Sequence, residues 1–242
     1  MATLLLVHAF PVDASMWKAQ VESLGDEHQV VAPSLPGFGG TAPVGEVMTM
    51  DAAAAFLAGE LDRADQARAV VCGLSMGGYV AFSLWRRHRD RVAGLVLANT
   101  RAEPDDDAGR ERRRGVAEKA RRGGSEAIAE SPPPLLSENA PDDLWDRVRA
   151  MIRAQPGEAI AAASLGMAER PDSRPILGEI DVPTAVLTAS GDTLIPPEVS
   201  SSMADAIPEA DLVVLEGAGH LSNLEDPQGF NTAVRAVLSR AG

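Results

Sequence analysis

The chain has 242 residues, 45% of them hydrophobic, which is enough to bury one core, and no low-complexity linker or repeat divides it. Its formal net charge of −13 argues against nucleic acid as a partner. A single cysteine, Cys72, excludes an internal disulfide, and four scattered histidines predict no metal site; we expect no cofactor. The first apolar run is too short to span a membrane and has no basic leader, so we expect a cytoplasmic protein without a membrane partner.

Apolar runs predict six strands that alternate with helical or loop-rich segments. The strands are expected near residues 3–8, 28–32, 69–74, 93–98, 184–190 and 211–216. Helical patterns run from 50 to 61 and from Pro227 to Leu238. This alternation predicts an α/β fold in which a parallel sheet is covered on both faces by helices.

The segment from 101 to 175 differs in character and contains no strong strand. Its clearest helical pattern, from Asp142 to Arg153, places Trp145 and three other apolar residues at helical spacing. We therefore expect a core of residues 1–100 and 176–242, with residues 101–175 inserted between strands as a small helical cap. Trp145 is a candidate substrate contact, and the alternative is that it only docks the cap onto the body.

A basic run within this segment holds seven Arg or Lys residues between Arg110 and Arg122. Such a run could attract an acidic substrate. Glu111 and Glu118 are interspersed in it, however, and this favours a solvated helix face.

Gly73-Leu74-Ser75-Met76-Gly77 places one serine between a predicted strand and a predicted helix. A sharp turn at this point holds a nucleophile in a strained backbone conformation. The residues two before and two after the serine must be small because the chain doubles back on itself, and Gly73 and Gly77 meet that demand. The pattern therefore predicts a nucleophilic Ser75.

Two downstream residues are candidate partners for this serine, which needs a base and a group that orients the base. Asp192 follows the predicted strand at 184–190, and His220 follows the strand at 211–216 through a Gly-rich loop. Catalytic groups of open α/β sheets gather at the carboxyl ends of strands. The alternative for Asp192 is that it only caps its turn, a role that does not exclude catalysis.

These segments together resemble the α/β-hydrolase family over nearly the whole chain. The stretch His8-Ala9-Phe10-Pro11 is similar to the family's oxyanion loop, Gly37-Phe38-Gly39-Gly40 to its second loop, and Gly217-Ala218-Gly219-His220 to its histidine loop. The resemblance is strongest to small esterases, to lactonases such as 3-oxoadipate enol-lactonase, and to cofactor-free haloperoxidase-like esterases. It implies an oxyanion hole made of the backbone N–H groups of Phe10 and Met76.

Two departures from the family's pattern stand out. Ala9 occupies a position where members usually carry glycine. The backbone there must suit a residue with a Cβ, and this affects the direction of the N–H group expected to bind the oxyanion. Members also begin with a strand hairpin, whereas only Met1-Ala2-Thr3 precede the first strand here, so we expect a truncated sheet. The strand near 28–32 would then form a sheet edge able to pair with a second copy in a homodimer.

The expected function is hydrolysis of a carboxylic ester or lactone of a small substrate through an acyl-enzyme on Ser75, with His220 as base and Asp192 orienting it. Three alternatives stay open because this scaffold hosts many reactions. The same triad could hydrolyse a carbon–carbon bond or carry out perhydrolysis, or the chain could be a ligand-binding module with little chemistry.

Overall fold

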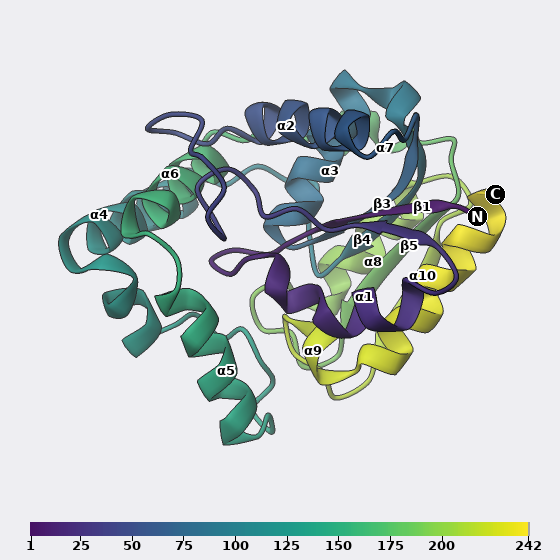
Figure 1. The fold of residues 1–242 in the computed structure, drawn as a ribbon. Coiled ribbons are helices and arrows are strands. Elements are labelled where there is room, and N and C mark those ends of the chain that lie inside the picture. The colour runs from purple at the N-terminus through teal and green to yellow at the C-terminus, as the bar shows by residue number, and fades with distance from the viewer. Residues whose placement is uncertain (242) are drawn as a thin grey trace.

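A computed structural model describes residues 1–241, and its centre is one sheet of six parallel strands in the order β2-β1-β3-β4-β5-β6 (Figure 1). The strands are β1 (Thr3–Val7), β2 (Gln29–Val31), β3 (Ala69–Leu74), β4 (Val92–Ala98), β5 (Thr184–Ala189) and β6 (Asp211–Leu215). The predicted α/β fold with six strands is therefore confirmed, and each strand begins and ends within about one residue of its expected place.

Burial explains why four strands read as continuous apolar runs. Every residue of β1, β3, β4 and β5 is buried, because these strands have a neighbour on each side and helices over both faces. The two outer strands are less buried than the inner ones. Gln29 in β2 is exposed, and Leu212 and Val214 in β6 are each 42% exposed. The centre of the sheet is thus built from four strands that are buried on both faces.

Helices cover both faces of the sheet, with α2 and α3 on one side and α1 and α10 on the other (Figure 1). The body contains η1 (Ala14–Trp17), α1 (Lys18–Leu24), α2 (Met50–Arg63), α3 (Met76–Arg87), η2 (Arg89–Arg91), α8 (Pro197–Ala206), α9 (Ser222–Glu225) and α10 (Pro227–Ala241). The helices predicted at 50–61, after Ser75 and from Pro227 to Leu238 correspond to α2, α3 and α10. Within residues 1–241, no helix combines the length and the apolar character that a membrane crossing needs.

The segment expected as a cap lies between β4 and β5 and is helical. It comprises α4 (Asp107–Glu130), α5 (Asp142–Arg153), α6 (Gly157–Ala168) and α7 (Arg174–Leu177), and α4, α5 and α6 lie together to the left of the sheet in Figure 1. The backbone of α4 is kinked at Gly124, where φ is +67°. The helix ends at Glu130, immediately before Ser131 and three consecutive prolines that cannot continue it.

Helix α6 connects the cap to the body through a close backbone approach. The Met48 N–H donates to the Ala162 carbonyl at 3.1 Å. One helical turn further on, a Cβ atom on Gly166 would overlap the carbonyl oxygen of Met48. Glycine at 166 is therefore required for α6 to lie this close to the segment that precedes α2.

We expect Gly166→Ala to destabilise the protein, since the new methyl group must push α6 away from Met48. Gly115→Ala is the matched control, because a Cβ at Gly115 in α4 meets no atom within 4 Å. The control should gain stability by about 0.5–1 kcal/mol from the lower entropy of the unfolded chain, whereas Gly166→Ala should lose more than that. Thermal unfolding measures both; equal shifts in the two variants would contradict the close approach.

Candidate active site

Ser75 lies in the turn between β3 and α3, in a backbone conformation that side chains with a Cβ rarely adopt. Its φ is +56° and its ψ is −112°. Its N–H donates to the Ala98 carbonyl of β4 at 2.9 Å, and its own carbonyl accepts the Thr100 hydroxyl at 2.8 Å. These bonds to the end of the neighbouring strand hold the strained residue in place.

The glycines around Ser75 are required by the turn. A Cβ on Gly73 would overlap the carbonyl oxygen of Gly77, and a Cβ on Gly77 would overlap the carbonyl oxygen of Val7 at the end of β1. The chain therefore doubles back as tightly as the sequence pattern predicts, with no room for a side chain at either position.

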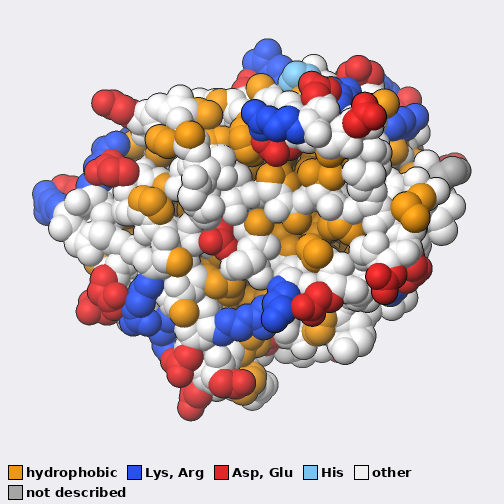
Figure 2. Space-filling view, viewed as in Figure 1, with side chains coloured by type: hydrophobic (Ala, Val, Ile, Leu, Met, Phe, Trp, Pro, Cys, Tyr) orange, Lys and Arg blue, Asp and Glu red, His pale blue; other side chains and the backbone are white. Residues whose placement is uncertain are grey.

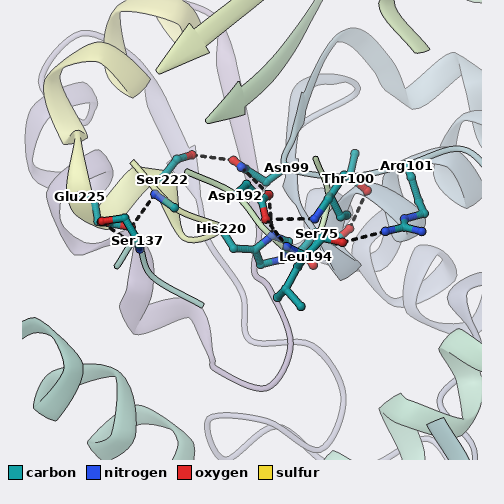
Figure 3. Close-up of polar contacts among 12 residues, drawn as sticks. Ser75, Asn99, Thr100, Arg101, Ser137, Asp192, Leu194, His220, Ser222 and Glu225 are labelled. Carbon is teal, nitrogen blue, oxygen red and sulfur yellow. Dashed lines mark hydrogen bonds and ion pairs between the residues drawn. The ribbon is translucent and has the colours of Figure 1, made fainter. Parts of the chain in front are cut away.

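Asp192 and His220 form a buried pair at the same edge of the sheet (Figure 3). Asp192 Oδ2 accepts a hydrogen bond from His220 Nδ1 at 2.8 Å, and the side chains are 0% and 3% exposed, respectively. Asp192 Oδ1 accepts the backbone N–H groups of Leu194 at 2.9 Å and Ile195 at 3.0 Å. The aspartate thus caps its turn and orients the histidine at once.

These contacts keep the carboxyl group of Asp192 ionised. Burial acts to raise its pKa, but the hydrogen bond from His220, the charge of that residue and the N–H donors outweigh burial and hold the pKa below its usual value. An ionised carboxylate at Oδ2 fixes the imidazole proton on Nδ1. The free electron pair of His220 is then on Nε2, the nitrogen that a general base uses.

Ser75 and His220 line the same cavity, which has a volume of about 350 Å³. Its wall combines apolar side chains with basic ones, and it runs from the end of the sheet to the cap. Phe10, Val116 and Leu194 are among its apolar residues, and its charged side chains other than His220 belong to Arg101, Asp105, Arg112, Arg113 and Lys119. A cavity of this size suits a small molecule.

The backbone N–H groups expected to form the oxyanion hole belong to Phe10 and to Met76, which directly follows Ser75 in the chain. Phe10 lines the cavity, and Met76 is the first residue of α3, where an N–H has no acceptor within the helix. Neither N–H donates to a protein acceptor in the part of the chain that the structure describes. Both are therefore available to a ligand oxygen.

Trp145, the candidate substrate contact of the cap, is placed elsewhere. It does not line the cavity; it lies half-buried on α5, with the Arg149 guanidinium 5.4 Å from its ring centre. Val148, Met151 and Ile152 on the same helix are buried. In this conformation the apolar residues of α5 pack the cap, and the cap residues that line the cavity lie mostly on α4, with Met167 of α6 beside them.

Residues 2–227 match a family model described as "alpha/beta hydrolase fold". The chain belongs to the α/β-hydrolase family. A pimeloyl-[acyl-carrier protein] methyl ester esterase from Aromatoleum aromaticum is 30% identical, over 97% of this chain and 97% of its own. The 3-oxoadipate enol-lactonase 2 of Acinetobacter baylyi is 28% identical, over 98% of this chain and 88% of its own.

Solved structures of such hydrolases are similar over about nine-tenths of their length. The malate-bound thermophilic esterase from Thermogutta terrifontis has a TM-score of 0.96 and 45% identity, covering 100% of this chain and 90% of that one. The enol-lactonase from Burkholderia xenovorans has a TM-score of 0.89 and 29% identity, covering 98% and 91%. The resemblance to esterases and enol-lactonases of this family is thus confirmed.

The hydrolase also uses a polar residue that the sequence analysis missed, Asn99. It is fully buried, with φ +44°, and its Nδ2 donates to Asp192 Oδ2 at 2.9 Å (Figure 3). The Ser222 hydroxyl donates to Asn99 Oδ1 at 2.6 Å, which turns the amide donor toward Asp192. The sequence does contain a signal for Asn99, because this residue directly follows a predicted strand, at the sheet edge where Asp192 and His220 were expected.

Glu225 is a second missed residue, and it ties the cap to the loop that carries His220. Its carboxylate accepts the Ser137 hydroxyl at 2.6 Å, the Ser137 N–H at 3.1 Å and the Gly219 N–H at 2.8 Å. On the other side of His220, the Leu221 N–H donates to the Leu135 carbonyl at 2.8 Å. The cap segment 135–137 therefore brackets the histidine.

We expect Glu225→Ala to lower the free energy of unfolding by about 1–3 kcal/mol, because it leaves the N–H groups of Ser137 and Gly219 without an acceptor. Glu138→Ala is the control, since Glu138 is an exposed neighbour in the same cap segment. Urea unfolding compares the two variants. Equal stabilities would contradict the bracing role of the Glu225 carboxylate.

His8 supports the loop that carries Phe10. The ring is fully buried, its Nδ1 bonds to the Ala9 carbonyl at 2.9 Å, and its Nε2 accepts the Leu35 N–H at 2.9 Å. Since Nε2 accepts, Nδ1 must carry the proton and donate, so the ring is neutral. Burial lowers the pKa of His8 from 6.5 to about 4, against the raising effects of the Ala9 carbonyl and Asp13.

This buried histidine makes stability depend on pH. Because the folded pKa lies below the unfolded one, the unfolded chain binds the proton first, and the contribution present above pH 6.5 is lost as the pH falls toward 4. We expect His8 to cost about 2 kcal/mol of stability between pH 8 and pH 5. Urea unfolding at both pH values measures the loss, and an NMR titration in which the His8 ring protonates above pH 6 would contradict it.

Proposed function

We propose that this chain is a serine hydrolase that cleaves a carboxylic ester or lactone of a small substrate through an acyl-enzyme. Ser75 is the nucleophile, His220 the general base and Asp192 the carboxylate that orients it. The observation that carries the proposal is the buried hydrogen bond between Asp192 and His220, beside a strained serine that lines the same cavity. The esterases and enol-lactonases among the similar proteins support a carboxylic ester hydrolase.

In the first step, His220 Nε2 takes the proton of the Ser75 hydroxyl while the oxygen attacks the ester carbonyl carbon. The carbonyl oxygen becomes an oxyanion, and the N–H groups of Phe10 and Met76 are the donors available to it. Each preorganised donor of this kind typically lowers the barrier by about 3–4 kcal/mol. The imidazolium that forms is stabilised by the ionised Asp192, whose Oδ2 accepts the Nδ1 proton.

The imidazolium then returns its proton to the leaving alkoxide, and the bond between the acyl carbon and the alcohol oxygen breaks. This leaves the acyl group as an ester on Ser75. In the second step His220 takes a proton from water, the hydroxide attacks the acyl carbon, and the serine oxygen leaves with the proton that the imidazole returns. The products are the free acid, the alcohol and the regenerated serine.

We expect wild-type protein to hydrolyse at least one member of a panel of p-nitrophenyl esters of increasing acyl length and simple lactones. Ser75→Ala should lower kcat by about 10⁴- to 10⁶-fold, because no side chain replaces the nucleophile. Ser202→Ala, the same substitution on the exposed face of α8, is the control and should keep full activity. The dependence of rate on acyl length would measure the reach of the cavity.

Activity that survives in Ser75→Ala would contradict the assignment of the nucleophile. A wild type inactive on every ester and lactone would contradict ester hydrolysis, and would direct attention to carbon–carbon bond substrates or to ligand binding.

A further inference from the structure

The cavity that holds Ser75 has the opposite charge from the rest of the protein. The chain carries a formal net charge of −13. The charged residues of the cavity wall, apart from His220, are nevertheless Arg101, Arg112, Arg113 and Lys119 on the basic side and Asp105 on the acidic side. A concave wall of one sign concentrates ligands of the other sign, so this reversal points to an anionic ligand.

Asp105 does not offset these cations, because it is already neutralised within the wall. Its carboxylate pairs with Arg113 at 3.1 Å and with the buried Arg170 at 2.9 Å. Burial acts to raise the pKa of Asp105, but both guanidinium groups outweigh burial and hold it below its usual value. Arg113 is therefore committed to Asp105, and Arg101 donates to the Leu194 carbonyl at 2.8 Å.

The two remaining cations of the cavity, Arg112 and Lys119, have no protein partner. Within residues 1–241, every one of the 22 Lys and Arg side chains makes an ion pair or a hydrogen bond except Arg112, Lys119 and Arg147. Arg147 lies on α5 and does not line the cavity. Two of the three unpaired cations are thus in the one wall that a substrate would meet.

The basic run of α4 is therefore divided by position. Arg110, Arg114, Arg121 and Arg122 each pair with an acidic side chain, as expected of a solvated helix face, whereas Arg113 lines the cavity and pairs there with Asp105. Figure 2 shows the same mixing on one face of the protein, where blue and red side chains lie beside one another along the left edge. The two basic residues of α4 left unpaired, Arg112 and Lys119, both line the cavity, with Val116 between them.

The spacing of these residues gives them a common face. Arg112, Val116 and Lys119 stand four and three positions apart, so they lie on one stripe of α4 over two turns. Seven residues of helix rise by about 10 Å. The stripe thus presents an apolar contact flanked by two cations to a ligand whose ester group is at Ser75.

We propose that Arg112 and Lys119 form an anion-recognition site in the active-site cavity, and that the substrates are small esters that carry a carboxylate remote from the reacting carbonyl. The inference rests on the proposed function, and it adds the charge of the substrate. A half-ester of a dicarboxylic acid is the simplest molecule of this class.

A pair of isosteric substrates isolates the charge. Monomethyl glutarate carries a terminal carboxylate, and the methyl ester of glutaramic acid carries a neutral amide of nearly the same shape. We expect wild type to have the higher kcat/KM for the half-ester. Arg112→Gln and Lys119→Gln should each lower that value about two- to fivefold, as for partly exposed ion pairs, and leave the amide ester unchanged. Salt should reduce the preference of the wild type.

Arg147→Gln is the matched control, since it removes an equally unpaired cation outside the cavity and should change neither rate. An equal preference for the two substrates, or equal effects of all three variants, would overturn the inference. Binding of monomethyl glutarate to Ser75→Ala, followed by NMR titration, gives a readout without turnover. It should weaken when Arg112→Gln or Lys119→Gln is added, and unchanged binding would overturn the inference.

Failure of the proposed function has a different signature. If the wild type hydrolyses neutral p-nitrophenyl esters in a Ser75-dependent way but has the same kcat/KM for both glutarate esters, ester hydrolysis is supported and the anion site is contradicted. If no ester is hydrolysed while the half-ester still binds through Arg112 and Lys119, the anion-binding site is supported and ester hydrolysis is contradicted.

Discussion

The hydrogen bond between Asp192 Oδ2 and His220 Nδ1 is the interaction on which the rest of the site depends. It keeps the imidazole proton on Nδ1 and leaves Nε2 as a base. Burial alone would raise the pKa of Asp192, and the hydrogen bond from His220, the N–H of Ile195 and the amide of Asn99 together hold that pKa below its usual value. A large part of the local structure serves to keep one carboxylate charged inside the protein.

The parallel sheet makes this arrangement possible, because the carboxyl ends of its inner strands meet at one edge. Ser75 follows β3, Asn99 follows β4 and Asp192 follows β5, so three neighbouring strands each deliver a residue to the same place. The strain at Ser75 is offset by bonds to Ala98 and Thr100, the residues that flank Asn99. Ser75 and Asp192, the proposed nucleophile and orienting group, are thus both hydrogen-bonded to the end of β4.

The cap contributes in two separate ways. Its loop at 135–137 braces the histidine through Glu225 and Leu221, which gives the catalytic loop a rigid neighbour. Its helix α4 contributes the basic wall of the cavity. In the proposed function, α4 therefore selects the substrate by shape and charge, whereas the end of the sheet holds the residues of the reaction.

Local patterns in the sequence were sufficient for the strands, the turn at Ser75 and the placement of Asp192 and His220, because each rests on residues adjacent in the chain. The role of Glu225 was not predicted, because its partner Ser137 lies 88 positions away in the chain and a local sequence pattern cannot indicate such a contact. Trp145 was predicted from helical spacing alone, which identifies an apolar face but not what the face packs against. The sequence likewise could not show that Arg112 and Lys119 lack an acidic partner, because this depends on where the acidic side chains lie in the folded protein.

The most direct test of the account is covalent labelling of the nucleophile. The protein would be treated with a p-nitrophenyl alkylphosphonate, which transfers its phosphonyl group to an activated serine, and peptides would be analysed by mass spectrometry. We expect one adduct per chain, on Ser75, and much slower labelling in His220→Ala, where no base removes the serine proton. Labelling of another residue, or equal rates with and without His220, would contradict it.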